Sequence, residues 1–436
     1  MQENHNAALI VLDTLREDFS GGLEALKARG FVKYENAVST SPWTLPSHVS
    51  MFTGELPSSH LVHESRGLHM SNIAQHSKSR LGASEANILR VLKSRGYTSY
   101  CHTCNPFISP AFGFEFDVHR EYRSMIEMTD VRQRIGSQKT PASKALALLR
   151  GGDLSLLLRL LRRRAAKRAY SALGRPVLDK GSKMALTQLR AGELRAPFFI
   201  YVNIMEAHEP YRWGEPMDVT RLSILARQVR NPGWKERYER NAALAVERGL
   251  EAVRAIERYD PLVVVTSDHG QLLGEGGRYG HGYFLDESLL RAPLYVRFPS
   301  GVDPPAQEGG CVSLKDVRAI IARAMDAAPV KVGGKAAMAE SFGPHVDLSP
   351  YLGADADAEL RRLYATRRRV FSKEGSVVYN SSTGVAEEAS GGIGEEEARE
   401  LAAMAASVRE APAPVVGMTA EEETELTERL SKLGYE

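Results

Sequence analysis

Three short apolar runs, far apart in the sequence, are each followed almost at once by acidic residues or histidine. The runs are Ala7–Leu12, Phe198–Asn203 and Leu262–Thr266, and the last is the most β-branched stretch of the chain. Continuous apolar runs of this length are typical of strands buried on both faces of a parallel sheet. Because ligands bind at the carboxyl ends of such strands, we expect the three polar endings to meet at one edge of the sheet.

Helical and strand-like patterns alternate along most of the chain, as they do in α/β proteins. The sequence predicts helices at Leu23–Arg29, Ile88–Arg95 and Arg237–Arg258, and further strands at Phe31–Tyr34, Tyr97–Cys101 and Leu294–Phe298. With 436 residues, 43% of them hydrophobic, the chain can bury a large core. We therefore expect an α/β fold with a mostly parallel central sheet flanked by helices, beginning with a β-α-β unit.

One long region interrupts this alternation. Residues 120–195 are rich in Leu, Ala, Arg and Lys and have little strand signal, so they predict a helical insertion or lid. Residues 154–168 within it predict a basic helix with a strong apolar component. Peripheral contact with a membrane, lipid or glycan is one alternative for this helix, and packing as a lid helix with a solvated basic end is the other.

The texture of the sequence changes again after about residue 300, where shorter helices and strands follow. This change divides the chain into an α/β domain at 1–300, which holds the three polar strand endings, and a smaller α+β subdomain at 301–436. Polar composition predicts a surface loop at 60–82, which holds four histidines, and a Gly- and Glu-rich surface segment at 384–400. A final charged helix is predicted at 420–433.

Charge and cysteine content exclude several classes of protein. The formal charge of +2, from 56 basic and 54 acidic residues, gives no global argument for nucleic-acid binding. Three cysteines are too few for a disulfide framework, and the pair Cys101 and Cys104 has no second pair with which to form a metal site.

The apolar runs of the sequence predict neither a membrane span nor a signal peptide. No uncharged apolar run approaches the roughly 20 residues that span a bilayer, and Ala7–Leu12 has no basic leader. A cytoplasmic location is therefore expected.

Residues 41–54 predict a loop that delivers a hydroxyl group to the start of a helix. Thr44 supplies the hydroxyl, Pro46 suits the first helical turn, and Gly54 ends the apolar pattern. The free N–H groups of a helix start attract anions. Taken alone, Thr44 is more simply a helix cap, so its interpretation as a catalytic residue depends on what lies beside it.

The polar endings of the three strands supply oxygen and nitrogen ligands for a divalent cation. Asp13 follows the first run, Asp268 and His269 follow the Val-rich run, and Glu206 and His208 follow the Phe198–Asn203 run. Each of these clusters could instead be a helix cap, a plain turn or a surface histidine. Their occurrence together favours a metal site.

A bound cation would suit a threonine nucleophile, because it lowers the cost of forming the alkoxide and neutralises the oxygens of an anionic ester. His208 and His281 are the candidates for acid catalysis at the leaving oxygen. His281 lies between Gly280 and Gly282, where a solvated loop is the alternative.

These motifs resemble the sulfatase family of the alkaline phosphatase superfamily over nearly the whole chain apart from the insertion. The matching segments are Val11–Asp18, Ser41–Gly54, Gly96–Thr98, Asn105–Pro106, Asn203–Tyr211, Thr266–Gly270, His281–Gly282, Arg291–Leu294 and Arg367–Tyr379. The resemblance implies that Asp13, Asp268 and His269 bind a metal, which could be Mn, Zn, Mg or Ca. It places Thr44 at the nucleophile position, where it also touches the metal.

The resemblance also implies roles for the histidines around this centre. His208 corresponds to the histidine that assists at the ester or leaving group, and His281 to a second-metal or substrate-binding residue. A second ion would use Glu206, His208 and His281. His48 stands where sulfatases have an arginine, and Asn105 falls near a substrate-binding segment of the family, so both are expected to bind substrate.

Departures from the sulfatase pattern indicate the type of ester. Sulfatases have Cys or Ser at the position of Thr44 and convert it to formylglycine, which threonine cannot form. Thr14 replaces the second aspartate of the usual pair. These changes resemble the phosphodiesterases, phosphonate hydrolases and phosphoglycerol or phosphoethanolamine transferases of the superfamily, which use threonine. The expected activity is therefore hydrolysis of a phosphate mono- or diester, or of a phosphonate.

Three alternatives to this activity stay open. The first is transfer of a phosphoryl-linked group to an acceptor such as a glycan or lipid headgroup. The second is hydrolysis of a sulfuric ester. The third belongs to a different class: an inactive homologue that binds an anionic ligand without catalysis.

Overall fold

The computed structural model describes residues 4–122, 179–211, 233–325, 330–345 and 357–411. Its centre is a seven-stranded sheet. From one edge to the other its strands are β2 (Val32–Lys33), β10 (Leu294–Arg297), β7 (Leu262–Thr266), β1 (Ala7–Leu12), β6 (Phe198–Ile204), β4 (Thr98–Thr103) and β5 (Val118–Glu121). The five strands from β7 to β5 run parallel, and β10 is antiparallel to β7 and β2. The predicted α/β fold with a mostly parallel sheet is confirmed.

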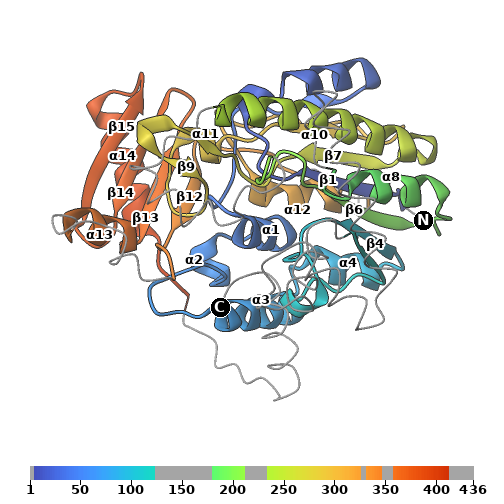
Figure 1. Cartoon of the computed structure of the whole chain (residues 1–436), viewed down its shortest axis with the longest axis horizontal. Helices are drawn as coiled ribbons and strands as arrows, with labels where there is room; N and C mark the ends of the chain where they lie inside the picture. Colours follow the sequence, from blue (N-terminus) through green and yellow to red (C-terminus); the bar gives the residue numbers. More distant parts are fainter. Residues whose placement is uncertain (1–3, 123–178, 212–232, 326–329, 346–356, 412–436) are drawn as a thin grey trace, which may run out of the picture.

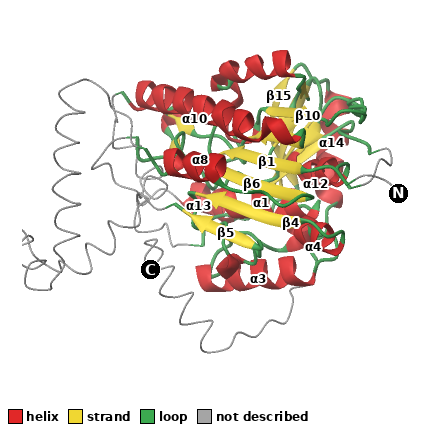
Figure 2. Ribbon diagram, turned by 90° about the vertical axis from the view of Figure 1, so that its right-hand side faces the viewer, coloured by secondary structure: helices red, strands yellow, loops and turns green. Residues whose placement is uncertain are grey.

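Helices cover both faces of this sheet (Figure 1, Figure 2). One face packs against α1 (Thr44–Thr53), α3 (Met70–Ala83), α4 (Ile88–Ser94) and α12 (Val317–Ala322), and the other against α8 (Ser182–Ala191), α10 (Trp234–Ile256) and the 3₁₀ helix η2 (Gly21–Arg29). Side chains of a strand alternate between faces. In β1, Leu9 and Val11 therefore enter the first core, whereas Ala8 and Ile10 enter the second.

A second, antiparallel sheet lies beside the main one, in orange to red in Figure 1. It consists of β12 (Ala337–Ser341), β13 (Arg367–Phe371), β14 (Gly375–Asn380) and β15 (Val385–Gly391), with α13 (Asp357–Tyr364) and α14 (Glu395–Ser407). The apolar residues of 312–325 belong to the core of the main sheet. The division of the chain near residue 300 stays a prediction.

Short elements border the carboxyl edge of the main sheet. They are the parallel pair β3 (Ala37–Val38) and β11 (Val312–Ser313), the antiparallel pair β8 (Leu272–Leu273) and β9 (Tyr279–Gly280), and the helices α2 (Pro57–His60) and α11 (Glu287–Leu290). Single-turn 3₁₀ helices lie at Glu17–Phe19, Pro110–Phe112, Glu257–Tyr259, Glu275–Gly277 and Leu314–Asp316.

The opening has the predicted order of strand, helix and strand, with the 3₁₀ helix η2 as the connection. β2 is antiparallel to β10, which is antiparallel to β7, so β2 runs parallel to β1 and β7, but it lies at the far edge of the sheet rather than beside β1. One local expectation was wrong. Residues 60–82 are not a loop; much of this segment is α3, whose apolar face packs on the main core. Residues 384–400 lie at the surface as predicted, and they form the exposed edge strand β15 and the start of α14.

Most of the predicted insertion lies outside the described residues, including the basic helix at 154–168, and so does the final helix at 420–433. The ends of the insertion are described, as β5 and α8. In the described ranges, no helix combines the length and the apolar character needed to cross a membrane.

Candidate active site

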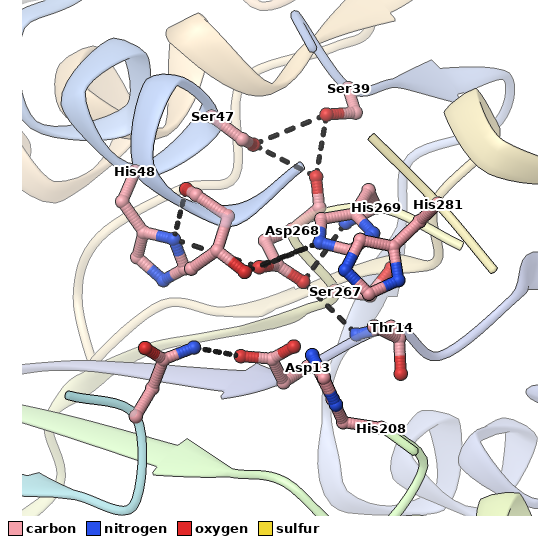
Figure 3. Close-up of polar contacts among 12 residues, drawn as sticks. Asp13, Thr14, Ser39, Ser47, His48, His208, Ser267, Asp268, His269 and His281 are labelled. Atoms are coloured by element: carbon pink, nitrogen blue, oxygen red, sulfur yellow. Dashed lines mark hydrogen bonds and ion pairs between the residues drawn. The ribbon is translucent and has the colours of Figure 1, made fainter. Parts of the chain in front are cut away.

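The carboxyl ends of three adjacent strands bring the predicted acidic residues together. Asp13 directly follows β1, and its backbone N–H donates to the carbonyl of Ile204 at the end of β6 (2.9 Å). Asp268 and His269 follow β7, the other neighbour of β1. Asp13, Asp268 and His269 are fully buried, and their potential ligand atoms lie within 4.8 Å of one another (Figure 3).

Each carboxylate of this group has one oxygen bound by the protein and one without a partner. The Oδ2 of Asp13 accepts hydrogen bonds from the side-chain amides of Asn105 (2.8 Å) and Asn203 (3.2 Å). The Oδ1 of Asp268 accepts the N–H groups of Thr14 (3.1 Å) and His269 (3.0 Å). The remaining oxygens, Asp13 Oδ1 and Asp268 Oδ2, are buried and have no hydrogen-bond partner among the described residues.

A buried carboxylate oxygen without a hydrogen-bond partner raises the free energy of the folded state, so a positive charge between these two oxygens would stabilise the fold. Burial, and then the neighbouring carboxylate of Asp268, raise the pKa of Asp13. A cation would remove the cause of that shift by compensating both charges. Two carboxylate oxygens and an imidazole nitrogen are suitable ligands for a divalent ion, so Asp13, Asp268 and His269 fit a metal.

Thr44 lies beside this group, at the first residue of α1. Trp43 before it is extended, and Thr44 begins the helix with its side chain 3% exposed. The Thr44 Oγ1 is 3.3 Å from Nε2 of His269. Helix α1 has ten residues and contains no acidic residue in its first turn, so its N-terminal dipole favours an anion near Thr44.

Two serines fix the start of α1 against the loop that follows β7. The hydroxyls of Ser39 (2.5 Å) and Ser47 (2.8 Å) both donate to the backbone carbonyl of Asp268. Figure 3 shows this pair above Asp268. The distance between Thr44 and the acidic group therefore depends on direct hydrogen bonds rather than on packing alone.

His48 is held entirely within the protein, although the sequence suggested substrate contact. Its Nδ1 is 2.8 Å from the carbonyl of Thr44, one helical turn earlier, and its Nε2 is 2.7 Å from the hydroxyl of Tyr201. Burial lowers the pKa of His48 to about 4, so the ring is neutral at physiological pH. Neither nitrogen is free for a substrate, because a helix directs residue i+4 back along its own first turn.

Asn105 also has a different place from the one expected. Its amide donates to Asp13, and its side-chain oxygen accepts the N–H of Phe107 (2.9 Å). Asn105 is 2% exposed. It therefore orients the Asp13 carboxylate rather than facing a substrate.

The second group of histidines contains a carboxylate that sequence reasoning missed. His208, Glu209 and His281 have potential ligand atoms within 4.8 Å of one another. The predicted member, Glu206, instead accepts the hydroxyl of Ser182 and the backbone N–H of Lys180. The carboxylate beside His208 and His281 is therefore Glu209 and not Glu206. The signal for Glu209 was its position next to His208, but nothing in the sequence pattern distinguished it from Glu206.

The histidine rings of this group lie close together. The ring centroids of His208 and His281 are 5.0 Å apart, and those of His269 and His281 are 4.6 Å apart. Although burial acts in the opposite direction, the adjacent His208 and His281 lower the pKa of Glu209 to about 2. Burial lowers the pKa of His281 to about 3.

Comparison with known proteins agrees with this geometry. A model of the Sulfatase family matches residues 6–327. Similar solved structures include a phosphonate monoester hydrolase from Silicibacter pomeroyi (15% identity, 92% of this chain and 93% of that chain, TM-score 0.53). Another is a putative sulfatase from Bacteroides thetaiotaomicron (12% identity, 99% and 92%, TM-score 0.55). At these identities the similarity shows the fold.

A curated relative also matches part of the chain. It is the low-salt glycan biosynthesis sulfotransferase Agl7 of Haloferax volcanii, 32% identical over 114 residues. The match spans 24% of this chain and 28% of the relative. The family model, in contrast, covers most of the chain, including the Thr44 helix and both groups of titratable residues. The chain belongs to the Sulfatase family.

Proposed function

We propose that this protein is a metal-dependent hydrolase that cleaves a phosphate mono- or diester, or a phosphonate, with Thr44 as its nucleophile. The observation that supports it best is the position of Thr44 Oγ1, 3.3 Å from His269 and at the start of a helix. The two unpartnered oxygens of Asp13 and Asp268 support metal dependence. A cation bound by Asp13, Asp268 and His269 would stabilise the Thr44 alkoxide and neutralise charge on the ester.

In the proposed first step, Thr44 Oγ1 forms a bond to phosphorus while the bond from phosphorus to the leaving oxygen breaks. The hydroxyl proton of Thr44 passes to a solvent water molecule as the bond forms. His208, which points towards Asp13 in Figure 3, donates a proton to the leaving oxygen when its ring is protonated. Water then attacks the phosphothreonine and restores the Thr44 hydroxyl, so phosphate or its monoester is released.

The test uses purified protein with added Mn²⁺, Zn²⁺, Mg²⁺ or Ca²⁺ and four probes. These are p-nitrophenyl phosphate, bis(p-nitrophenyl) phosphate, p-nitrophenyl phenylphosphonate and p-nitrophenyl sulfate. We expect turnover of at least one phosphorus ester, and a mass increase of one phosphoryl-containing group on a peptide containing Thr44 after rapid quenching. Thr44→Ala should lose both signals, because it removes the oxygen that is proposed to form the bond to phosphorus.

Two controls separate chemistry from folding. Thr44→Ala should unfold at a temperature close to that of the wild type and still gain stability from the cation. Asp13→Asn should lose that gain, because it replaces a charged ligand by a neutral amide. Wild-type turnover by Thr44→Ala would contradict the nucleophile. A cation that stabilises neither the wild type nor Thr44→Ala would favour the inactive anion-binding alternative.

Transfer to an acceptor alcohol is the second candidate function. The observation that favours it is the name of the Haloferax volcanii relative, which describes a sulfotransferase of glycan biosynthesis. In a transferase, an alcohol would take the place of water in the second step. Incubating a labelled donor, phosphate or sulfate, with and without glycans distinguishes the two: a transferase labels the glycan, whereas a hydrolase releases only the free anion.

A further inference from the structure

Glu209 and Gln271 form a buried hydrogen-bonded link to His281. Glu209 is 2% exposed and Gln271 is fully buried. The Nε2 of Gln271 donates to Oε2 of Glu209 (2.8 Å), and the Oε1 of Gln271 is 2.7 Å from Nδ1 of His281. Neither residue belongs to the group of Asp13, Asp268 and His269, and the proposed reaction has no role for either.

The direction of these hydrogen bonds follows from the chemistry of the three side chains. An ionised carboxylate only accepts hydrogen bonds, so the NH₂ group of Gln271 must face Glu209. The oxygen of Gln271 then faces His281 and can only accept. The Nδ1 of His281 therefore holds the proton, and its Nε2 is left as a lone pair.

Two neighbouring histidines have the same tautomer for a different reason. The Nδ1 of His208 is 2.6 Å from the carbonyl of Glu209, and that of His269 is 2.9 Å from the carbonyl of Gly270. A backbone carbonyl can only accept a hydrogen bond, so it always selects a protonated Nδ1. The side-chain amide of Gln271 could instead turn its NH₂ group towards His281 by rotating through 180°. Of these three histidines, His281 is therefore the one whose tautomer depends on a further side chain, Glu209, which fixes the orientation of the amide.

The same hydrogen bonds argue against a cation held between His208, Glu209 and His281 through their nearest atoms. The histidine nitrogens that face Glu209 Oε2 are Nδ1 of His208 and Nδ1 of His281, each at 3.6 Å. Both already face an acceptor and hold a proton. A cation at this place would have to remove both protons and break both hydrogen bonds, so these atoms do not fit a metal.

We propose that Glu209 is a positioning residue: through Gln271 it fixes His281 in the tautomer that presents an unprotonated Nε2 to the active site. The value of this tautomer rests on the proposed function. The Nε2 lone pair of His281 can accept a hydrogen bond from the water that attacks the phosphothreonine, beside the ring of His269. With the other tautomer, Nε2 would donate instead and the acceptor would be lost.

The tautomer can be measured without turnover. In protein labelled with ¹⁵N-histidine, long-range ¹H–¹⁵N spectra distinguish a protonated Nδ1 from a protonated Nε2, and a His281→Asn spectrum assigns the ring. We expect the Nδ1-protonated form in the wild type and in Thr44→Ala. In Glu209→Gln, which preserves the volume of the side chain, the amide of Gln271 is free to rotate and a second tautomer of His281 should appear.

A double substitution provides the sharpest test. In Glu209→Gln/Gln271→Glu the carboxylate stands next to His281. It accepts one hydrogen bond from Nδ1–H of His281 and another from the side-chain amide of residue 209. The direction of the link is thereby restored. If Glu209 acts through the link, Glu209→Gln should lower kcat by about 10- to 100-fold with little change in KM. The double variant should recover the Nδ1-protonated form and most of the lost kcat.

Glu64→Gln is the matched control, because Glu64 is also a buried carboxylate beside a histidine, His345 (2.9 Å). It should change neither kcat nor the spectrum of His281. An unchanged His281 tautomer in Glu209→Gln would overturn the proposal, and so would a Zn²⁺ titration that deprotonates Nδ1 of His281. If no probe is turned over by the wild type, the proposed function fails, but the spectra still decide the role of Glu209.

Discussion

At the scale of single residues, burial sets the protonation state of some side chains in this protein. Burial, with a smaller contribution from Arg120, lowers the pKa of His102 from 6.5 to about 4. His102 is 4% exposed, its ring stacks on Tyr122, and its Nδ1 is 2.8 Å from the Tyr122 hydroxyl. Such a histidine is neutral in the folded protein, so it opposes folding wherever the unfolded chain binds a proton and the folded chain does not.

His102→Gln should therefore change the pH dependence of stability in a defined direction. The unfolded chain takes up the proton near pH 6.5 and the folded chain only near pH 4. The free energy of unfolding of the wild type, relative to that of His102→Gln, is constant above pH 6.5. It falls as the pH drops from 6.5 to about 4, and is constant again below that. The total loss is roughly 3 kcal/mol. Urea unfolding of both proteins at pH 8, 6, 5 and 4 measures this; a difference that does not vary with pH would contradict it.

The sequence was informative about residues that end a buried strand and uninformative about residues that support them. Asp13, Asp268 and His269 could be grouped because parallel strands place their carboxyl ends together. Asn203 donates to Asp13 across 190 positions of sequence, and Glu209 accepts from Gln271 across 62. No local pattern of hydrophobicity or spacing encodes such partners, so Glu206 and Glu209 were indistinguishable in the sequence.

The loop after β7 shows how a structural element sets the geometry of the site. This loop contains Asp268 and His269 and then passes directly against α11. The N–H of Gly270 donates to the carbonyl of Leu289 (2.7 Å), and the side chain of Arg16 donates to the carbonyl of Gln271 (3.1 Å). The close approach is possible only because Gly270 has no side chain.

Gly270→Ala should displace this loop. A Cβ atom at this position would overlap the carbonyl oxygen of Ser288, which is backbone and cannot move aside easily. We expect a loss of about 1–3 kcal/mol in stability and a larger relative loss of turnover, because Asp268 and His269 shift with the loop.

Thermal unfolding and p-nitrophenyl ester kinetics measure the two effects of Gly270→Ala. Gly21→Ala is the control, because a Cβ atom at Gly21 meets nothing within 4 Å. This change should alter stability by less than about 0.5 kcal/mol and leave turnover unchanged. Equal activity of the two variants would mean that the loop adapts.

Elements with a strong pattern were predictable, whereas elements defined by distant pairing were not. The apolar run of β7 and the amphipathic pattern of α10 identified both elements within a few residues. β2 was predicted as a strand, but its antiparallel partner β10 comes more than 250 residues later. Helix α3 was missed because its polar residues outnumber the five buried positions that anchor it.

At the scale of the whole molecule, buried charges join the second sheet to the catalytic half. Arg368 in β13 donates to Glu340 in β12 (2.8 Å), and both side chains are at most 4% exposed. The other oxygen of Glu340 accepts the N–H of Ser58 in α2 (2.7 Å). Arg367 donates to the carbonyl of Tyr283, two residues after His281 (2.8 Å). The position of the His281 loop thus depends on a sheet that begins after residue 336.

Glu340→Gln should reveal this dependence, because it leaves the buried charge of Arg368 without a counter-ion. Loss of one partner of a buried pair costs about 3–5 kcal/mol. Since Glu340 contacts both halves, we expect one calorimetric transition at a lower temperature, with activity lost in that same transition. Glu395→Gln, which removes the exposed partner of Arg399, should cost less than about 1 kcal/mol. If Glu340→Gln instead splits the transition in two, with activity persisting through the first, the second sheet folds independently and does not support the active site.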